Sequence, residues 1–110
     1  MTTWCVTRWE ESSTPDETSL HRALARLGIR GQRWSNGPGV EYATHEHPYR
    51  KVIYVLAGAI EFGLPDFGDR IVLAAGDCLD LPAHTRHHAL VGEAGVACLE
   101  THQSPDDAQL

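Results

Sequence analysis

Between Ile29 and His102 the chain is divided into short segments of alternating apolar and polar residues, separated by turn-forming residues. Successive side chains of a β-strand point to opposite faces, so a period of two over about four to eight residues indicates a half-buried strand. The expected strands are residues 29–34, 40–47, 51–56, 59–64, 70–74, 77–81, 87–91 and 96–102. The expected turns, rich in glycine, proline or alanine, are residues 36–39, 57–58, 65–68, 75–76 and 92–95. This spacing favours an all-β sandwich or closed barrel.

One segment near the N-terminus has a helical pattern instead. Residues 14–17 (Thr-Pro-Asp-Glu) form a capping box with proline at the first helical position. Apolar residues then recur at the spacing of one helical face, at Leu20, Leu24 and Leu27, and a glycine follows. We therefore expect one short amphipathic helix over about residues 15–27, packed against the outside of the β-domain.

The length and charge of the chain exclude several classes of protein. A chain of 110 residues forms one domain, so we assign residues 1–110 to a single unit with a polar tail at 103–110. The net charge of -6 argues against a nucleic-acid partner, because such binding needs lysines and arginines to neutralise phosphates. No apolar segment approaches the roughly 20 residues that span a bilayer, and the first residues lack the features of a signal peptide. We expect a cytoplasmic protein with no membrane partner.

Histidines are placed where strands can bring them together. His45 and His47 are two residues apart in an expected strand, so both imidazoles point to the same face. His87 begins a distant strand and can add a third nitrogen at the same point. Neutral imidazole is a suitable ligand for zinc, iron, nickel and copper. The pattern predicts a divalent metal site inside a strand-rich domain.

Two segments resemble the two motifs of the cupin superfamily. The first, residues 39–58, has the pattern Gly-x5-His-Glu-His-x3-Lys-x6-Gly. The second, residues 76–91, has the pattern Gly-x5-Pro-Ala-His-x2-His-x3-Val. The resemblance covers about half of the chain. It implies a double-stranded β-helix, also called a jelly roll or cupin barrel. It also implies a metal held by the two histidines of the first motif, a glutamate after them, and the last histidine of the second.

The ligand positions of that resemblance fall on His45, His47 and His87, but Lys51 stands where the glutamate is expected. A protonated ammonium has no lone pair and cannot bind a metal. The second motif also departs from the family, because His84 replaces its usual glycine and Val91 its usual terminal asparagine.

Three interpretations of Lys51 stay open. In the first, three histidines hold the metal, as in some cupin dioxygenases that the site resembles, and Lys51 anchors an anionic or carbonyl-bearing substrate. In the second, Glu100 or His102 on the last strand supplies a fourth ligand, since alternation turns Glu46 away from the shared face. In the third, the pocket has lost metal binding and holds a small organic ligand through hydrogen bonds.

These observations favour a small metal-dependent enzyme, dioxygenase-like or an isomerase or lyase, that acts on a small organic anion. The metal is expected to be iron, zinc, nickel or manganese, and Lys51 is the candidate catalytic residue. The alternative is a metal-independent or non-catalytic module that binds a small molecule. Additional pocket candidates are His84, Glu100, His102 and Tyr54, although alternation directs Tyr54 opposite to Lys51.

The N-terminal residues 4–9 have the composition of a strand, which can protect an open sheet edge across a partner chain. Open edges need protection, and the family resemblance points in the same direction. We therefore expect a homodimer.

Overall fold

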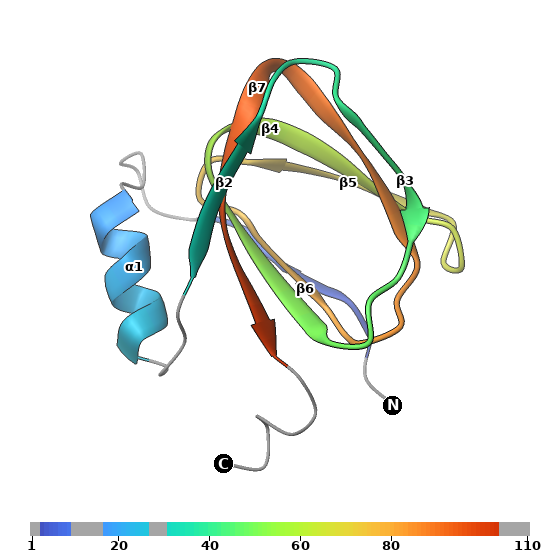
Figure 1. The fold of residues 1–110 in the computed structure, drawn as a ribbon, viewed down its shortest axis with the longest axis horizontal. Helices are drawn as coiled ribbons and strands as arrows, with labels where there is room; N and C mark the ends of the chain where they lie inside the picture. Colours follow the sequence, from blue (N-terminus) through green and yellow to red (C-terminus); the bar gives the residue numbers. More distant parts are fainter. Residues whose placement is uncertain (1–2, 10–16, 27–30, 104–110) are drawn as a thin grey trace.

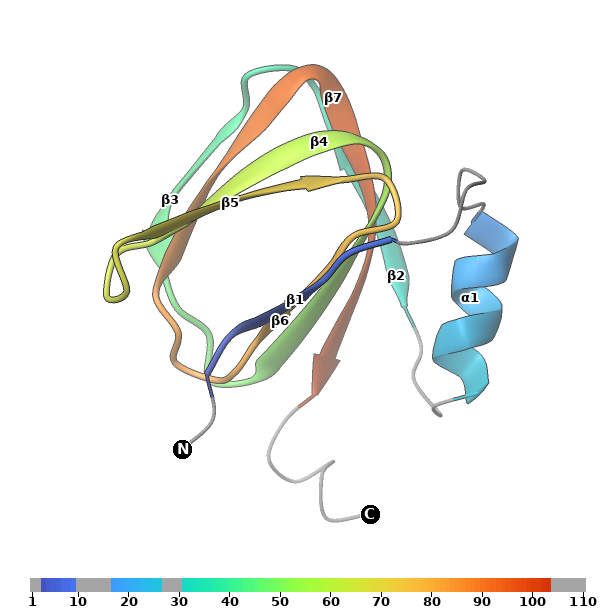
Figure 2. The ribbon, with the colours of Figure 1, turned by 180° about the vertical axis from the view of Figure 1, so that it is seen from behind.

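A computed structural model describes residues 3–9, 17–26 and 31–103. Seven strands and one helix make up this part of the chain. In chain order they are β1 (Cys5–Thr7), α1 (Glu17–Arg26), β2 (Gln32–Asn36), β3 (Glu41–His45), β4 (Arg50–Leu64), β5 (Asp69–Ala74), β6 (Cys78–Leu81) and β7 (His87–Gln103). The strands curl into an open-ended barrel (Figures 1 and 2). The predicted all-β class is confirmed.

The two longest strands, β4 and β7, form the centre of the sheet. The strand order is β1-β6-β4-β7-β2, and in addition β3 pairs with β7 and β5 pairs with β4. Every pairing is antiparallel. Strands β2 and β3 therefore pair with β7, whereas β5 and β6 pair with β4. These two groups form the two sides of the barrel.

Two of the predicted turns are bends inside continuous strands. Residues 57–58 lie within β4 and residues 92–95 lie within β7, where the β4–β7 register shifts. The glycine at the first bend, Gly58, has a positive φ of 74°. A β-bulge adds a residue to one strand and bends it, which is how a long strand turns a barrel corner. The prediction that both strands end at these points is therefore wrong.

The bend in β4 also changes which side chains point inward. Before it, Ile53 and Val55 are buried at odd positions, and after it Ile60 and Phe62 are buried at even positions. The extra residue at the bulge shifts the alternation by one, so that both halves of β4 face the interior.

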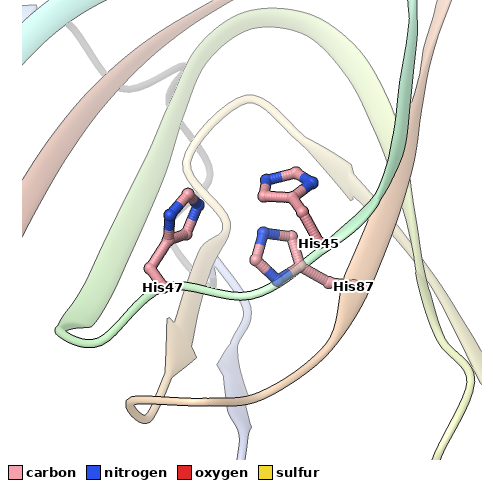
Figure 3. Close-up of side chains that lie close together, drawn as sticks. All are labelled: His45, His47 and His87. Carbon is pink, nitrogen blue, oxygen red and sulfur yellow. The ribbon is translucent and has the colours of Figure 1, made fainter.

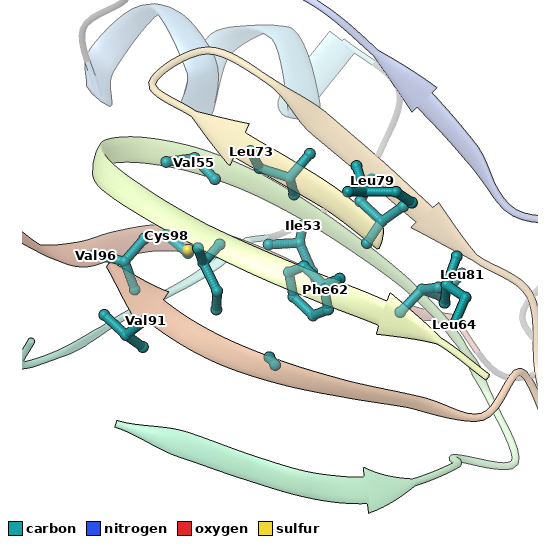
Figure 4. Packing of buried hydrophobic residues seen from close by; sticks show 13 residues of the cluster. Ile53, Val55, Phe62, Leu64, Leu73, Leu79, Leu81, Val91, Val96 and Cys98 are labelled. Carbon is teal, nitrogen blue, oxygen red and sulfur yellow. The ribbon is translucent and has the colours of Figure 1, made fainter. Parts of the chain in front are cut away.

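The hydrophobic core fills part of the barrel between β4, β5, β6 and β7 (Figure 4). Its buried members are Ile53, Val55, Ile60, Phe62, Leu64, Ile71, Leu73, Leu79, Leu81, Ala89, Val91, Val96 and Cys98. Strand β5 shows the alternation clearly, because Ile71 and Leu73 are buried while Val72 between them is 55% exposed. The apolar period of two that predicted these strands is therefore the period of burial.

Helix α1 lies outside the ring of strands, on the side of β2 (Figure 1). The predicted ends of this helix, residues 15–16 and 27, and the tail from residue 104 onward fall outside the described residues. In the part of the chain that the structure describes, no helix has the length and apolar character needed to cross a membrane.

Candidate metal centre

Three histidines converge inside the barrel (Figure 3). Strand β3 ends at His45, which pairs with His87 at the start of β7, and His47 lies two residues beyond the end of β3. The ring centroids are 4.4 Å apart for His45 and His87, 4.7 Å for His45 and His47, and 5.4 Å for His47 and His87. One ring nitrogen of each residue lies within 4.8 Å of the others. These three nitrogens can therefore approach a common ion.

The orientation of the rings fits a metal. His45 Nδ1 is 2.6 Å from the Ala43 carbonyl, and His87 Nδ1 is 2.9 Å from the Thr85 carbonyl. A neutral imidazole that donates from Nδ1 presents an unprotonated Nε2, and metal-binding histidines are commonly held in this way. The Nε2 atoms of His47 and His87 are buried and have no hydrogen-bond partner among the described residues. Buried nitrogens are costly to leave unpaired, and a divalent ion would satisfy them.

The environment of His47 and His87 favours the neutral form of both imidazoles. Burial lowers the pKa of His87 from 6.5 to about 4. Burial also lowers the pKa of His47, and the positive charge of Lys51 acts in the same direction. Neutral imidazole is the form that binds a metal, so the lowered pKa values of His47 and His87 favour metal binding.

The metal-free protein should lose stability in acid because of His87. The unfolded histidine takes up a proton near pH 6.5, whereas the folded one resists protonation down to about pH 4. The contribution of His87 is thus complete above pH 6.5 and is lost as the pH falls toward 4. The loss amounts to at most about 3 kcal/mol.

We expect urea unfolding in the presence of a chelator to show this loss between pH 7.5 and pH 4.5. His87→Gln should flatten the dependence, while His88→Gln, at the exposed neighbouring position, should keep it. A pH dependence that is identical in the two variants would contradict this role of His87.

His84 supports the centre through its backbone. Its N–H donates to the carbonyl of His47 over 2.7 Å, which ties the loop before β7 to the segment that carries a candidate ligand. Its side chain is exposed and lies 3.0 Å from a Glu46 carboxylate oxygen. The φ angle of His84 is 65°, in the left-handed region that favours glycine. This conformation explains why the motif that the chain resembles has a glycine at this position.

A pocket of about 360 Å³ opens beside two of the three histidines. Strands β2, β3, β4 and β7 supply its walls. The lining residues are Gln32, Trp34, Asn36, Tyr42, His45, Lys51, Ile60, Phe62, His87, Ala89 and Glu100. Of the predicted site residues, His45, His87, Lys51 and Glu100 therefore share one pocket.

Glu100 is the centre of a polar network in this pocket. Its Oε1 lies 3.1 Å from Lys51 Nζ and accepts a hydrogen bond from Trp34 Nε1 over 3.0 Å. Its Oε2 is paired with Nε2 of His102. The Lys51 and Glu100 side chains are only 15% and 13% exposed. Glu100 is thus engaged by three donors rather than directed at the histidine cluster.

His102 is exposed and connects to the histidine cluster through an aromatic stack. The Tyr49 ring stacks on His47 at 4.8 Å and on His102 at 4.4 Å. Tyr49 and Trp34 were not among the predicted site residues. Tyr49 follows His47 by two residues, so the same-face spacing that linked His45 to His47 was a signal for it. No local pattern predicted Trp34 as a site residue. The pairing of β2 with β7 places it beside Glu100.

Tyr54 is not part of the pocket. It packs with Trp9, Leu56 and Leu99 in a separate cluster. Burial raises the pKa of Tyr54 to about 12. Tyr54 is three residues after Lys51 in the same strand, so the alternation of side chains already predicted that Tyr54 would face away from the site.

Comparisons with known proteins agree with this architecture. A family model described as "Cupin domain" matches residues 33–99, which is more than half of the chain. A search of curated proteins finds no match. Among solved structures, the chain is similar to an RmlC-like cupin from Shewanella frigidimarina NCIMB 400, with 24% identity, a TM-score of 0.60, and coverage of 74% of this chain and 71% of that one.

Two further similar structures carry names that indicate activities. The polyketide cyclase RemF from Streptomyces resistomycificus has 22% identity and a TM-score of 0.62, over 68% of this chain and 54% of that one. The DMSP lyase DddQ from Ruegeria pomeroyi DSS-3 has 21% identity and a TM-score of 0.63, over 70% of this chain and 39% of that one. Similarity at this level of identity shows the fold alone. The predicted jelly-roll barrel is confirmed, and the chain belongs to the cupin domain family.

Proposed function

We propose that this cupin binds a divalent metal ion through His45, His47 and His87 and acts on a small organic anion held in the adjacent pocket. One observation carries the proposal: three imidazoles converge, and two of them present buried Nε2 atoms with no partner among the described residues. A satisfied structural histidine would have a hydrogen-bond partner there.

The chain's own groups suit a dioxygenase-like, isomerase or lyase reaction. When bound, the ion, which we propose to be iron, zinc, nickel or manganese, supplies a Lewis acid or, for iron, a redox centre. Lys51 donates hydrogen bonds to negative charge on the substrate, and the apolar wall of the pocket excludes water. Among proteins with this fold, one is named as a polyketide cyclase and another as a DMSP lyase, which supports small-molecule chemistry in this pocket.

Elemental analysis of protein purified without added metal tests the proposal. We expect close to one equivalent of iron, zinc, nickel or manganese per chain. Chelation should lower the melting temperature, and returning the metal should restore it, because an ion that binds only the folded state stabilises it. Metal far below stoichiometry, together with no thermal shift when Zn²⁺, Fe²⁺, Ni²⁺ or Mn²⁺ is added, would overturn the metal assignment.

A metal-independent binding module is the second candidate, and Lys51 is the observation that favours it. The Lys51 ammonium lowers the pKa of His47, so its positive charge also opposes a divalent ion at the same place. In that case the thermal shift would come from an organic anion and not from any metal.

Variants of Lys51 separate the open interpretations of this residue. Lys51→Glu alone would place a carboxylate beside Glu100, and like charges in a half-buried site repel. We therefore expect Lys51→Glu/Glu100→Gln to bind Zn²⁺ at least about tenfold more tightly than the natural protein, with Lys51→Glu between the two. Competition with a fluorescent chelator measures these affinities. Equal affinities in all three proteins would place position 51 out of reach of the ion.

If Glu100 were itself a ligand, Glu100→Gln alone would weaken Zn²⁺ binding. With three histidines as the ligand set, Glu100→Gln instead leaves the affinity unchanged or lower by only a small factor, because its carboxylate is already engaged by Lys51, Trp34 and His102.

A further inference from the structure

We propose that the pocket selects a small ligand with one negative charge and a planar, apolar body, such as an aromatic carboxylate or enolate, and that Lys51 is the residue that determines this specificity. The inference rests on the pocket of the proposed function and adds the chemical class of its ligand. The charge, hydrogen-bonding capacity and walls of the pocket carry it.

Among the described lining residues, the one lysine, Lys51, is paired with the one carboxylate, Glu100, so the lining suits a ligand with at most one negative group. Lys51 is the only lysine or arginine among the lining residues that the structure describes. Recognition of a phosphate or a dicarboxylate generally uses arginine forks or several cations. One ammonium matches a single carboxylate or enolate oxygen.

The Lys51 ammonium is fixed by an ion pair and retains free hydrogen-bond donors. One contact goes to Glu100 Oε1, at 3.1 Å. An ammonium carries three N–H groups, and the described residues provide no second hydrogen-bond partner for this one. The ion pair therefore fixes the Nζ position beside the pocket and leaves donors for an incoming anion, which lowers the entropy cost of binding.

Four polar side chains of the wall are already paired with one another. Asn36 donates to the Tyr42 hydroxyl, and the Trp34 indole N–H donates to Glu100. A ligand that carries many hydroxyl groups, such as a sugar acid, would find few free partners here and would lose hydrogen bonds to water. This pairing argues against a polyhydroxylated body.

The remaining wall is aromatic and aliphatic. Trp34 and Tyr42 meet edge to face with centroids 6.3 Å apart, and Phe62, Ile60 and Ala89 are buried on the inner side. Aromatic rings favour offset-stacked or edge-on contact with a planar partner. A volume of about 360 Å³ is near the lower end of the range for ligand pockets, so the body is small.

Three probes separate charge from shape: benzoate, the uncharged benzamide, and glucuronate, which has the same charge on a hydroxylated ring. Titration calorimetry is carried out on chelator-treated protein and again after loading with Zn²⁺. We expect benzoate to bind at least about tenfold more tightly than either of the other two, since a charged hydrogen bond in a half-buried site is worth at least that factor. Binding of glucuronate as tight as that of benzoate would overturn the apolar-body inference.

Lys51→Met should remove the preference for benzoate over benzamide. Because this variant leaves Glu100 with one donor fewer, Lys51→Met/Glu100→Gln provides a neutral wall, and it should also show no preference. The matched control is Arg50→Met, which removes the adjacent cation; Arg50 is paired with Asp80 and does not line the pocket. If the preference persists in the double variant, Lys51 does not determine specificity.

The outcomes distinguish this inference from the proposed function. Zn²⁺ binding without any preference for benzoate overturns the ligand class alone. Benzoate binding that depends on Lys51 in a protein that takes up no metal overturns the metal assignment and supports the ligand class.

Discussion

Replacing His47 with alanine is expected to abolish stoichiometric metal binding and to lower Zn²⁺ affinity by more than about 100-fold. The loss should exceed the about 10- to 100-fold typical of residues that only support a ligand, because one of three coordinating nitrogens disappears. His47 Nε2 is buried and unpaired, so the ion has no alternative donor at that place among the described residues. Elemental analysis and chelator competition measure the two effects.

His88→Ala is the matched control for this experiment. His88 follows a candidate ligand directly in β7 but is exposed on the opposite face of the strand. It should retain full metal content. Full occupancy in His47→Ala, or an equal loss in both variants, would show that the cluster in Figure 3 is not the metal site.

Replacing Gly58 with alanine is expected to destabilise the barrel by more than about 3 kcal/mol, an unusually large effect for adding one methyl group. The φ of Gly58 is 74°, and the left-handed region costs a residue with a Cβ about 1 kcal/mol relative to glycine. In addition, the Cβ would lie 2.0 Å from the Gly95 carbonyl oxygen. The Cβ is bonded directly to the backbone of β4, and the oxygen belongs to the backbone of β7. Relieving the contact would therefore require one strand to move, which would break hydrogen-bonded pairs between β4 and β7.

Gly68→Ala separates the two causes. Gly68 has a nearly identical φ of 69°, but a Cβ there meets nothing within 4 Å. It should cost only about 1 kcal/mol in urea unfolding. If the two variants lost equal stability, the contact between Gly58 and Gly95 would have no energetic role.

The sequence alone predicted the class of fold and the grouping of the three histidines for physical reasons. Strand alternation places His45 and His47 on one side, and the burial of Ile71 and Leu73 follows the same rule. The family resemblance then supplied what alternation could not, namely that the last histidine of the second motif, His87, belongs to the same site as His45 and His47.

The bends within β4 and β7 could not be predicted from periodicity. A glycine with a one-residue shift in the apolar alternation is found both at a turn, where the chain reverses direction, and at a bulge, where the strand continues. The sequence pattern is the same in the two cases. Only the pairing of Gly58 with Val96 on the partner strand decides between the two.

The partner of Lys51 was also beyond local patterns. Glu100 was considered as a metal ligand because it lies on the last strand. In the structure it is engaged by Lys51, Trp34 and His102, which come from three different strands. Such a network depends on the relative register of distant segments, which no short motif encodes.

The position of β7 in the sheet has a consequence for biosynthesis. In the part of the chain that the structure describes, β2 and β3 pair with no strand other than β7. While the ribosome still holds residues 87–103, the nascent polypeptide can align neither of them, and His45 and His87 remain apart. The three-histidine cluster can therefore form only after β7 has been synthesised and has paired with β3.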